Sequence, residues 1–216
     1  MRKQFAVLLL VACVLACAGC ELLNKNPTAP PPTSVQQSVV DTLASRIDKP
    51  SATASASQAD INWWRSMSQV SRNMAVLDAA YANYFYRASL DRQSPYAPYS
   101  GWYTCKTWVQ QVVVPNASRG VASVPTNNGS CSWYGGCYAS AWGGGIRNVG
   151  QGMIVQTRWG GGLHTAIVYA RDPNGMWWID CNWGLDSRIR IHYVTFGTFD
   201  VKSGGCYTIY QINGGC

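Results

Sequence analysis

The sequence predicts an α+β domain, with helices first and an antiparallel sheet after them. Apolar residues recur at spacings of three and four between Ile61 and Phe85, which is the period of an α-helix. After Gly152, short segments alternate polar and apolar residues or are apolar throughout, as strands are. The chain of 216 residues is long enough to bury a core of one domain. This order of elements therefore favours helices packed on an antiparallel sheet.

The first residues are typical of an export signal. A positively charged start, with Arg2 and Lys3, precedes an apolar segment over residues 5–16. That segment is too short to span a membrane comfortably as a stop-transfer helix. The pattern therefore predicts a signal peptide over residues 1–19.

A cysteine follows this segment. Small residues precede Cys20, which resembles the lipobox of bacterial lipoproteins. Acyl chains on Cys20 would anchor the protein to a membrane while the rest stays in water. Glu21 stands where an aspartate would favour the inner membrane, so we expect the cell envelope and the periplasm-facing outer membrane. Cys17 is a second possible acylation site, and an ordinary cleaved signal, giving a secreted protein, is the alternative.

The rest of the chain divides by composition. Residues 20–59 are predicted to form a tether, because their Pro- and Ser-rich composition keeps them extended and unable to pack. Residues 60–99 form a helical segment, with Asp60 as its N-cap and one long or two short helices between 61 and 90. Residues 100–216 form the core domain.

The charge is modest. The formal net charge is +7, and removal of Arg2 and Lys3 with the signal lowers it to +5. The positive residues form no dense run, so nucleic acid is not an expected partner. Mild attraction to an anionic polymer such as a cell wall is compatible with this charge.

Export also bears on the cysteines, because an oxidising compartment allows some of them to pair. Short loops favour Cys131 with Cys137 and Cys206 with Cys216, although connectivity is not settled by sequence. These pairings leave two core cysteines free, Cys105 and Cys181. The core has no Cys-x-x-Cys pair and no ligand-like spacing of histidines, so neither a metal nor a cofactor is expected.

Cys105 is the candidate nucleophile. It opens a helix predicted over residues 104–114 and stopped by Pro115. A thiol attacks as thiolate, and its pKa falls at a helix N-terminus and beside an imidazolium. The free N–H groups of a first helical turn could also stabilise an oxyanion. A buried apolar role, or half of a disulfide, is the alternative for Cys105.

The candidate base is one of only two histidines. His164 begins a predicted strand, and a histidine in that place is often structural. His192 lies within a later strand, in Arg-Ile-His-Tyr-Val, and we interpret it as structural or substrate-lining. The assignment of His164 as the base therefore depends on whether a carboxylate reaches it.

The turn predicted over residues 172–175 decides that question. Its sequence, Asp-Pro-Asn-Gly, suits a three-residue hairpin loop with a bulge and with Gly175 at positive φ. Because strand side chains alternate between faces, this register puts Asp180 and Asn182 on the face of His164. A two- or four-residue loop would shift the register by one and move Asp180 to the far face.

The ordered set of residues resembles the CHAP and NlpC-like branch of the papain superfamily of cysteine hydrolases. The family pattern is a cysteine opening a helix, a strand beginning with histidine and a strand with an acid-x-Asn pair, here at Cys105, His164 and 180–182. Residues 152–156 (Gly-Met-Ile-Val-Gln) are similar to the family's Gly-Asp-Ile-Ile-Gln strand, with methionine replacing the acid. CHAP members often carry Glu at the place of the aspartate, and helices 61–90 have no counterpart.

The resemblance implies a papain-like core and a cell-wall amidase or endopeptidase that cleaves amide bonds in peptidoglycan peptides. In it, Cys105 attacks the carbonyl, His164 transfers the proton, and Asp180 with Asn182 orients the imidazole. The expected partners are peptidoglycan and, through the lipid anchor, a membrane. A transglutaminase-like acyl transferase shares the order Cys, His, Asp, and an envelope-binding lipoprotein with a silent site is the non-enzymatic alternative.

Overall fold

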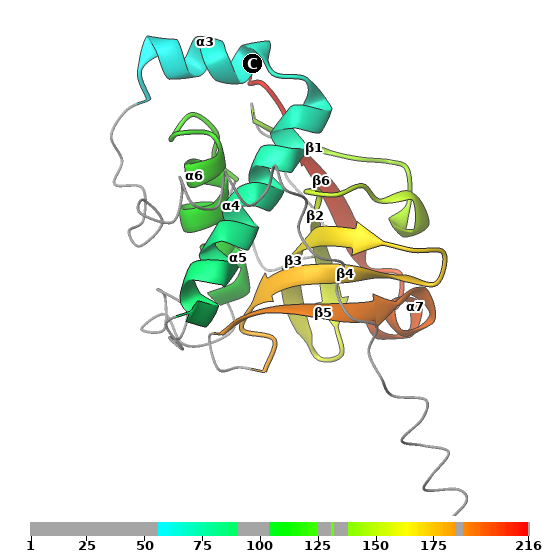
Figure 1. The fold of residues 1–216 in the computed structure, drawn as a ribbon. Coiled ribbons are helices and arrows are strands. Elements are labelled where there is room, and N and C mark those ends of the chain that lie inside the picture. The colour runs from blue at the N-terminus through cyan, green and yellow to red at the C-terminus, as the bar shows by residue number, and fades with distance from the viewer. Residues whose placement is uncertain (1–55, 90–103, 125–130, 132–137, 185–187, 216) are drawn as a thin grey trace, which may run out of the picture.

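A six-stranded sheet forms the centre of the protein in the computed structural model, which describes residues 56–89, 104–124, 131, 138–184 and 188–215 (Figure 1). The strands are β1 (Ala139–Ala141), β2 (Ile154–Trp159), β3 (Gly162–Arg171), β4 (Gly175–Cys181), β5 (Ile189–Thr195) and β6 (Tyr207–Ile212). Their order is β1-β6-β2-β3-β4-β5, and all neighbouring pairs are antiparallel. The α+β class predicted from the sequence is confirmed.

Helices cover the sheet on both faces. The helical elements are α3 (Gln58–Ser66), α4 (Gln69–Ser89), α5 (Thr104–Trp108), the π-helical turn η2 (Val109–Val113), α6 (Val114–Ala117), the 3-10 turn η3 (Ile146–Asn148) and α7 (Phe196–Ser203). One buried cluster joins α3, α4 and the α5–α6 run to one face of the sheet. A second cluster joins α7 and η3 to the other face. The site described below lies where α5 meets the strands β3 and β4.

The N-terminal segment forms two helices, α3 and α4, which was one of the two predicted alternatives. They part at Met67, and the indole of Trp64 in α3 donates a 2.9 Å hydrogen bond to the carbonyl of Asn213. The predicted N-cap was wrong by three residues, because the Ser57 hydroxyl accepts from the backbone N–H of Asp60 at 3.1 Å. Asp60 therefore lies in the first turn, where a negative charge suits the helix dipole.

The helical run that begins at Thr104 does not stop at Pro115 as predicted. It passes through the π-helical turn η2 and ends at Ala117. Pro115 lies in the first turn of α6, where the missing N–H of proline is tolerated. The run is thus longer than its proline suggests, and it buries Val109, Val112 and Val113 in the cluster that joins α4 to the sheet.

The β3–β4 hairpin has a register that differs from the predicted one but keeps the predicted faces. Arg171 lies opposite Met176, so four residues separate this pair in place of the predicted three, and this alone would turn Asp180 away. A bulge at residue 169 adds one residue to β3 and shifts the register again. Asp180 then pairs with Ala166, two residues from its predicted partner, on the face of His164.

The turn of this hairpin is held by Asp172. Its Oδ1 accepts from the N–H groups of Asn174 and Gly175 at 2.7 and 2.8 Å, which is an Asx turn. Gly175 does not take the predicted positive φ but is the first residue of β4, opposite Thr195. A Cβ at residue 175 would lie 2.5 Å from the carbonyl oxygen of Val194, so close approach of β5 is what favours glycine there.

The disulfide prediction was wrong. Cys131 is bonded to Cys206 across 75 residues of sequence, and this excludes the short-loop pairings that were expected. The bond joins the segment before β1 to the start of β6, a proximity that exists only once the sheet has formed. The predicted partners Cys137 and Cys216 lie outside the described residues. Cys105 and Cys181 form no disulfide, as expected, and both are buried.

Several predictions of the N-terminal part fall on residues that the structure does not describe. The signal peptide over residues 1–19, the acylated Cys20 and residues 20–55 of the predicted tether lie outside the described residues. The tether was predicted to end at residue 59, whereas α3 already begins at Gln58. Of the helices that are described, none is both long enough and apolar enough to cross a membrane. Strand β1 and helix α7 were not predicted.

Candidate active site

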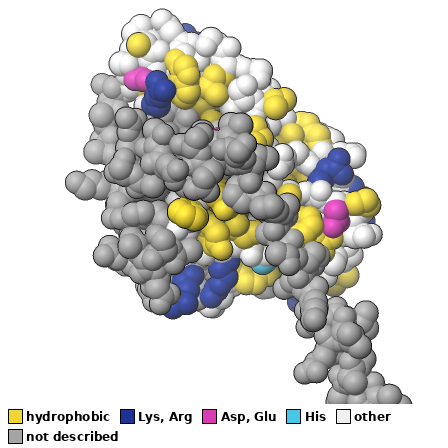
Figure 2. Space-filling model, in the orientation of Figure 1, with side chains coloured by type: hydrophobic (Ala, Val, Ile, Leu, Met, Phe, Trp, Pro, Cys, Tyr) yellow, Lys and Arg dark blue, Asp and Glu magenta, His cyan; other side chains and the backbone are white. Residues whose placement is uncertain are grey.

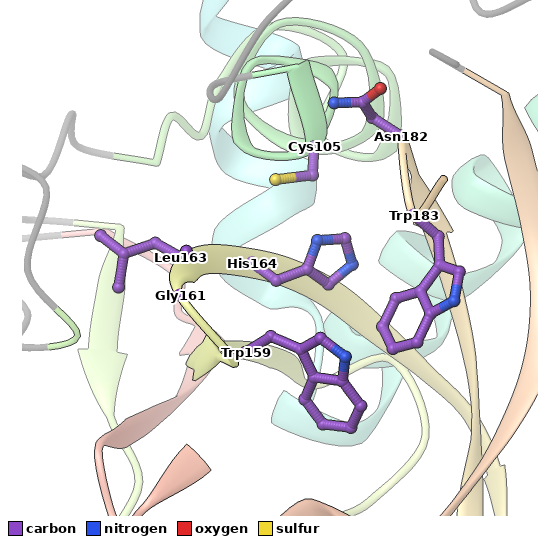
Figure 3. A pocket seen from close by; sticks show the side chains of 8 residues that line it. Cys105, Trp159, Gly161, Leu163, His164, Asn182 and Trp183 are labelled. Atoms are coloured by element: carbon purple, nitrogen blue, oxygen red, sulfur yellow. The ribbon is translucent and has the colours of Figure 1, made fainter. Parts of the chain in front are cut away.

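Cys105 is the second residue of α5, and its side chain reaches the start of β3 (Figure 3). The residue is 4 % exposed and lines a pocket of about 250 Å³. Two groups of β3 form hydrogen bonds with the thiol: the imidazole of His164 and the backbone N–H of Thr165. The sulfur is therefore buried from most sides but open to a cavity that a ligand could enter.

His164 connects the thiol to a carboxylate. Its Nε2 lies 2.8 Å from Oδ2 of Asp180, and both side chains are buried. Because Asp180 pairs with Ala166, the two residues are diagonal neighbours on one face of β3 and β4. Asp180 occupies Nε2, so Nδ1 is the nitrogen left to bond the thiol of Cys105. The structure thus brings the thiol of α5 together with the imidazole and the carboxylate that the sequence predicted on one face of the hairpin.

The thiol and the imidazole change each other's proton affinity. Burial alone raises the pKa of Cys105, but the hydrogen bond and positive charge of His164 outweigh it, and the pKa lies below its ordinary value. Burial alone lowers the pKa of His164, but the charge and hydrogen bond of Asp180 and the thiolate raise it well above its usual range. The pair therefore favours a thiolate beside an imidazolium, which is the reactive form of a nucleophilic cysteine.

Asp180 has a second imidazole partner. Nε2 of His192 lies 2.6 Å from the same Oδ2 that bonds His164. Burial opposes ionisation of Asp180, yet the charge and hydrogen bonds of the two histidines lower its pKa to about 2. The sequence interpretation of His192 as structural or substrate-lining missed this contact. The missing information was that β5 pairs with β4, with Asp180 opposite Arg190, which puts residue 192 on the face of the carboxylate.

Asn182 was predicted as a second orienter of the imidazole or as a polar wall of the site, and the structure places it among the residues that line the pocket. It follows β4, adopts a left-handed φ of 69°, and is 6 % exposed. In Figure 3 its amide points toward α5, on the side of the pocket where Cys105 lies. Asp180 holds Nε2 of His164, so the side chain of Asn182 is placed to act at the thiol end of the site.

Two tryptophans wall the pocket. Trp159 and Trp183 line it together with Leu163 and two glycines, residues 161 and 162 (Figure 3). Their ring centroids are 4.9 Å apart, and the ring of Trp183 also lies 5.2 Å from that of His164. No Lys, Arg, Asp or Glu is among the described residues that line the cavity. The walls therefore suit the uncharged part of a substrate.

Little of the histidine surface is open to solvent. On the face shown in Figure 2, a small histidine surface lies low on the molecule, among hydrophobic side chains and near Lys or Arg side chains. His164 is 8 % exposed as a residue, and the side chain of His192 is 15 % exposed. The imidazoles are thus covered by protein, which strengthens their interaction with Asp180.

Lys106 follows the thiol in the chain and is also buried. Its Nζ has no hydrogen-bond partner within the described part of the chain. Burial lowers the pKa of Lys106 to about 8, and the charge of Cys105 opposes this shift. The ammonium is therefore poorly stabilised beside a site where every other charged group has a partner.

The described residues contain no group of three or more His, Cys, Asp or Glu side chains that could hold a metal ion. The site is instead a linear array of a thiol, an imidazole and a carboxylate. Comparison of the chain with protein families, with curated proteins and with solved structures gives no match.

Proposed function

We propose that this protein is a cysteine hydrolase of the cell envelope that cleaves amide bonds in peptidoglycan peptides. The observation that carries the proposal is the connected series Cys105, His164 and Asp180, whose sulfur borders an accessible pocket. The resemblance of the same residues to CHAP and NlpC-like enzymes supplies the substrate class. A papain-like core and a lipid anchor at Cys20 belong to this proposal.

The geometry supports a two-step acyl transfer. The thiolate of Cys105 attacks the scissile carbonyl carbon, and the carbonyl oxygen takes the negative charge. The imidazolium of His164 then gives its Nδ1 proton to the leaving amine, the C–N bond breaks, and a thioester remains. His164 next removes a proton from water, which attacks the thioester and releases the carboxylic acid and the thiolate.

Two groups are placed to stabilise the oxyanion. The first is the backbone N–H of Cys105, in the first turn of α5. The second is the side-chain amide of Asn182, which lines the same pocket. Asp180 keeps the imidazole oriented and its charge compensated throughout, without taking a proton itself.

The test is mass spectrometry of muropeptides after incubation of purified sacculi with the wild-type protein and with Cys105→Ala. We expect new peptide ends with the wild type only, since alanine removes the attacking sulfur. Cys181→Ala is the matched control, because Cys181 is also a buried cysteine outside the disulfide, and it packs on the face of the sheet that α4 covers. Release by Cys105→Ala at the wild-type rate would exclude this mechanism, and incorporation of an added amine in place of water would indicate an acyl transferase.

A further inference from the structure

Both histidines of the chain bond the same carboxylate oxygen. His164 approaches Oδ2 of Asp180 from β3 at 2.8 Å, and His192 approaches it from β5 at 2.6 Å. The carboxylate lies on β4 between them and is fully buried. The thiol, the two rings and the carboxylate therefore form one continuous hydrogen-bonded series across three strands and a helix.

His192 donates one of the two side-chain hydrogen bonds that hold Oδ2 of Asp180. The other oxygen of Asp180, Oδ1, is buried and has no hydrogen-bond partner within the part of the chain that is described. A buried carboxylate without partners is costly and tends to take up a proton. Loss of the bond from His192 would thus leave Oδ2 with His164 alone, and the position of Asp180 would be fixed from one side only.

The ring of His192 is itself held in place. It contacts Trp183 at 4.1 Å between ring centroids and meets Trp178 edge-on at 5.9 Å. The charged or titratable groups on its face are Asp180 from β4, His164 from β3, and Arg190 two residues earlier on β5. The ring is therefore directed at Asp180 by packing, and the pocket wall Trp183 covers it.

We propose that His192 is a positioning residue that fixes Asp180 and, through it, the imidazole that acts on Cys105. This rests on the proposed cysteine hydrolase function. When His164 gives its proton to the leaving amine, the imidazolium becomes neutral and Asp180 loses the positive charge of His164. The N–H of His192 continues to hold the carboxylate in place, so that His164 keeps the orientation needed to accept a proton from water. His192 does not touch the substrate in this scheme.

The test compares three variants by kcat, by KM and by the rate at which iodoacetamide alkylates Cys105. His192→Phe keeps an aromatic ring against Trp183 but removes the donor, whereas His192→Gln places an amide N–H at a similar reach. Tyr193→Phe is the control, because it removes a hydrogen bond to Asp172 from the other face of the same strand. All three are first compared with the wild type by thermal unfolding.

We expect His192→Phe to lower kcat by about ten- to hundredfold, as for loss of a hydrogen bond to a charged group, with KM within about twofold. His192→Gln should restore kcat to within about fivefold of the wild type, and Tyr193→Phe should leave it unchanged. Alkylation of Cys105 at pH 6 should follow the same order. If His192→Phe does not fold, His192→Asn replaces it, because its shorter amide should not reach Oδ2.

Two results would overturn the inference. One is a His192→Phe protein with the kcat and alkylation rate of the wild type. The other is an equal loss in the Gln and Phe variants at equal thermal stability, since the donor would then be irrelevant. Alkylation needs no substrate, so it reports on His192 even if peptidoglycan is not cleaved, and the failure of the inference is distinguishable from the failure of the proposed function.

Discussion

Asp180 and Asp78 are both removed from solvent, but to different degrees. Burial raises the pKa of an aspartate, yet the more buried of the two has the lower pKa. Asp180 is fully buried, and its pKa is about 2. Asp78, on α4, is partly buried, and its pKa is raised to about 6 by burial. Oδ1 of Asp78 has no hydrogen-bond partner within the described residues, whereas Asp180 accepts from two imidazoles. The difference in pKa between the two aspartates therefore comes from their hydrogen-bond partners and not from their burial.

The same contrast distinguishes the two faces of the sheet. On the face that carries Asp180, the carboxylate belongs to one connected network with His164 and His192. Lys106 on α5 and Asp78 on α4 are also removed from solvent. Within the described residues, neither Nζ of Lys106 nor Oδ1 of Asp78 has a hydrogen-bond partner. Changes at the network should therefore act mainly on activity, and changes at the isolated groups mainly on stability.

The largest effect is expected for Asp180→Asn. An amide carries no negative charge, so the imidazolium of His164 would lose its charge compensation even if the amide oxygen took the place of Oδ2, and an NH2 group in that place would face both histidine donors. We expect kcat/KM to fall by a factor on the order of 10³ to 10⁴, as when a triad carboxylate becomes an amide. The measurement is peptide release from sacculi, with Asp78→Asn as the control. An Asp180→Asn protein within tenfold of the wild type would place the orienting role elsewhere.

A smaller effect is expected for alkylation of Cys105 in His164→Ala. The hydrogen bond and charge of His164 lower the pKa of Cys105, so its removal should return the thiol toward or above its ordinary value. At pH 6 the iodoacetamide rate should then fall by about tenfold or more relative to the wild type, and the difference should shrink as the pH rises toward the pKa of the variant thiol. A wild-type rate that falls tenfold for each pH unit below 8 would show that the thiol has no such support.

The comparison also shows what the sequence could predict. Local periodicity was enough for α3, α4 and the strands β2 to β6, since each signal lies within a few residues. The strand β1 has three residues and α7 has eight, so neither carries a strong period. The Cys131–Cys206 bond was out of reach because it depends on which strands are neighbours.

The sequence predicted the correct face for Asp180 but the wrong strand register. The turn after β3 was assigned the wrong length, and a bulge at residue 169 compensates for it, so Asp180 still faces His164. A bulge leaves no clear mark in a single sequence, because any residue can be the extra one. The contact of His192 with Asp180 needed a third strand as well, and a sequence pattern within one hairpin contains no information about it.

The smallest effect is expected for Asp78→Asn, and it concerns stability. The pKa of Asp78 rises from 3.8 to about 6 on folding, so the native state binds the proton more tightly. Its contribution therefore favours folding below pH 4, is lost as the pH rises through 6, and is unfavourable at pH 7. An amide carries no charge, so Asp78→Asn should raise the free energy of unfolding at pH 7 by about 1–2 kcal/mol.

This gain should disappear in acid. Urea unfolding of the wild type and of Asp78→Asn at pH 7 and pH 4 measures the difference at both values. Asp200→Asn, at an exposed aspartate that pairs with Arg147, is the control for loss of a surface carboxylate and its ion pair. An Asp78→Asn protein that is less stable than the wild type at pH 7 would mean that the carboxylate has a favourable partner in the folded state. In that case Asp78 and Asp180 would both be stabilised by partners. The contrast between a network that serves activity and isolated groups that affect only stability would then not hold.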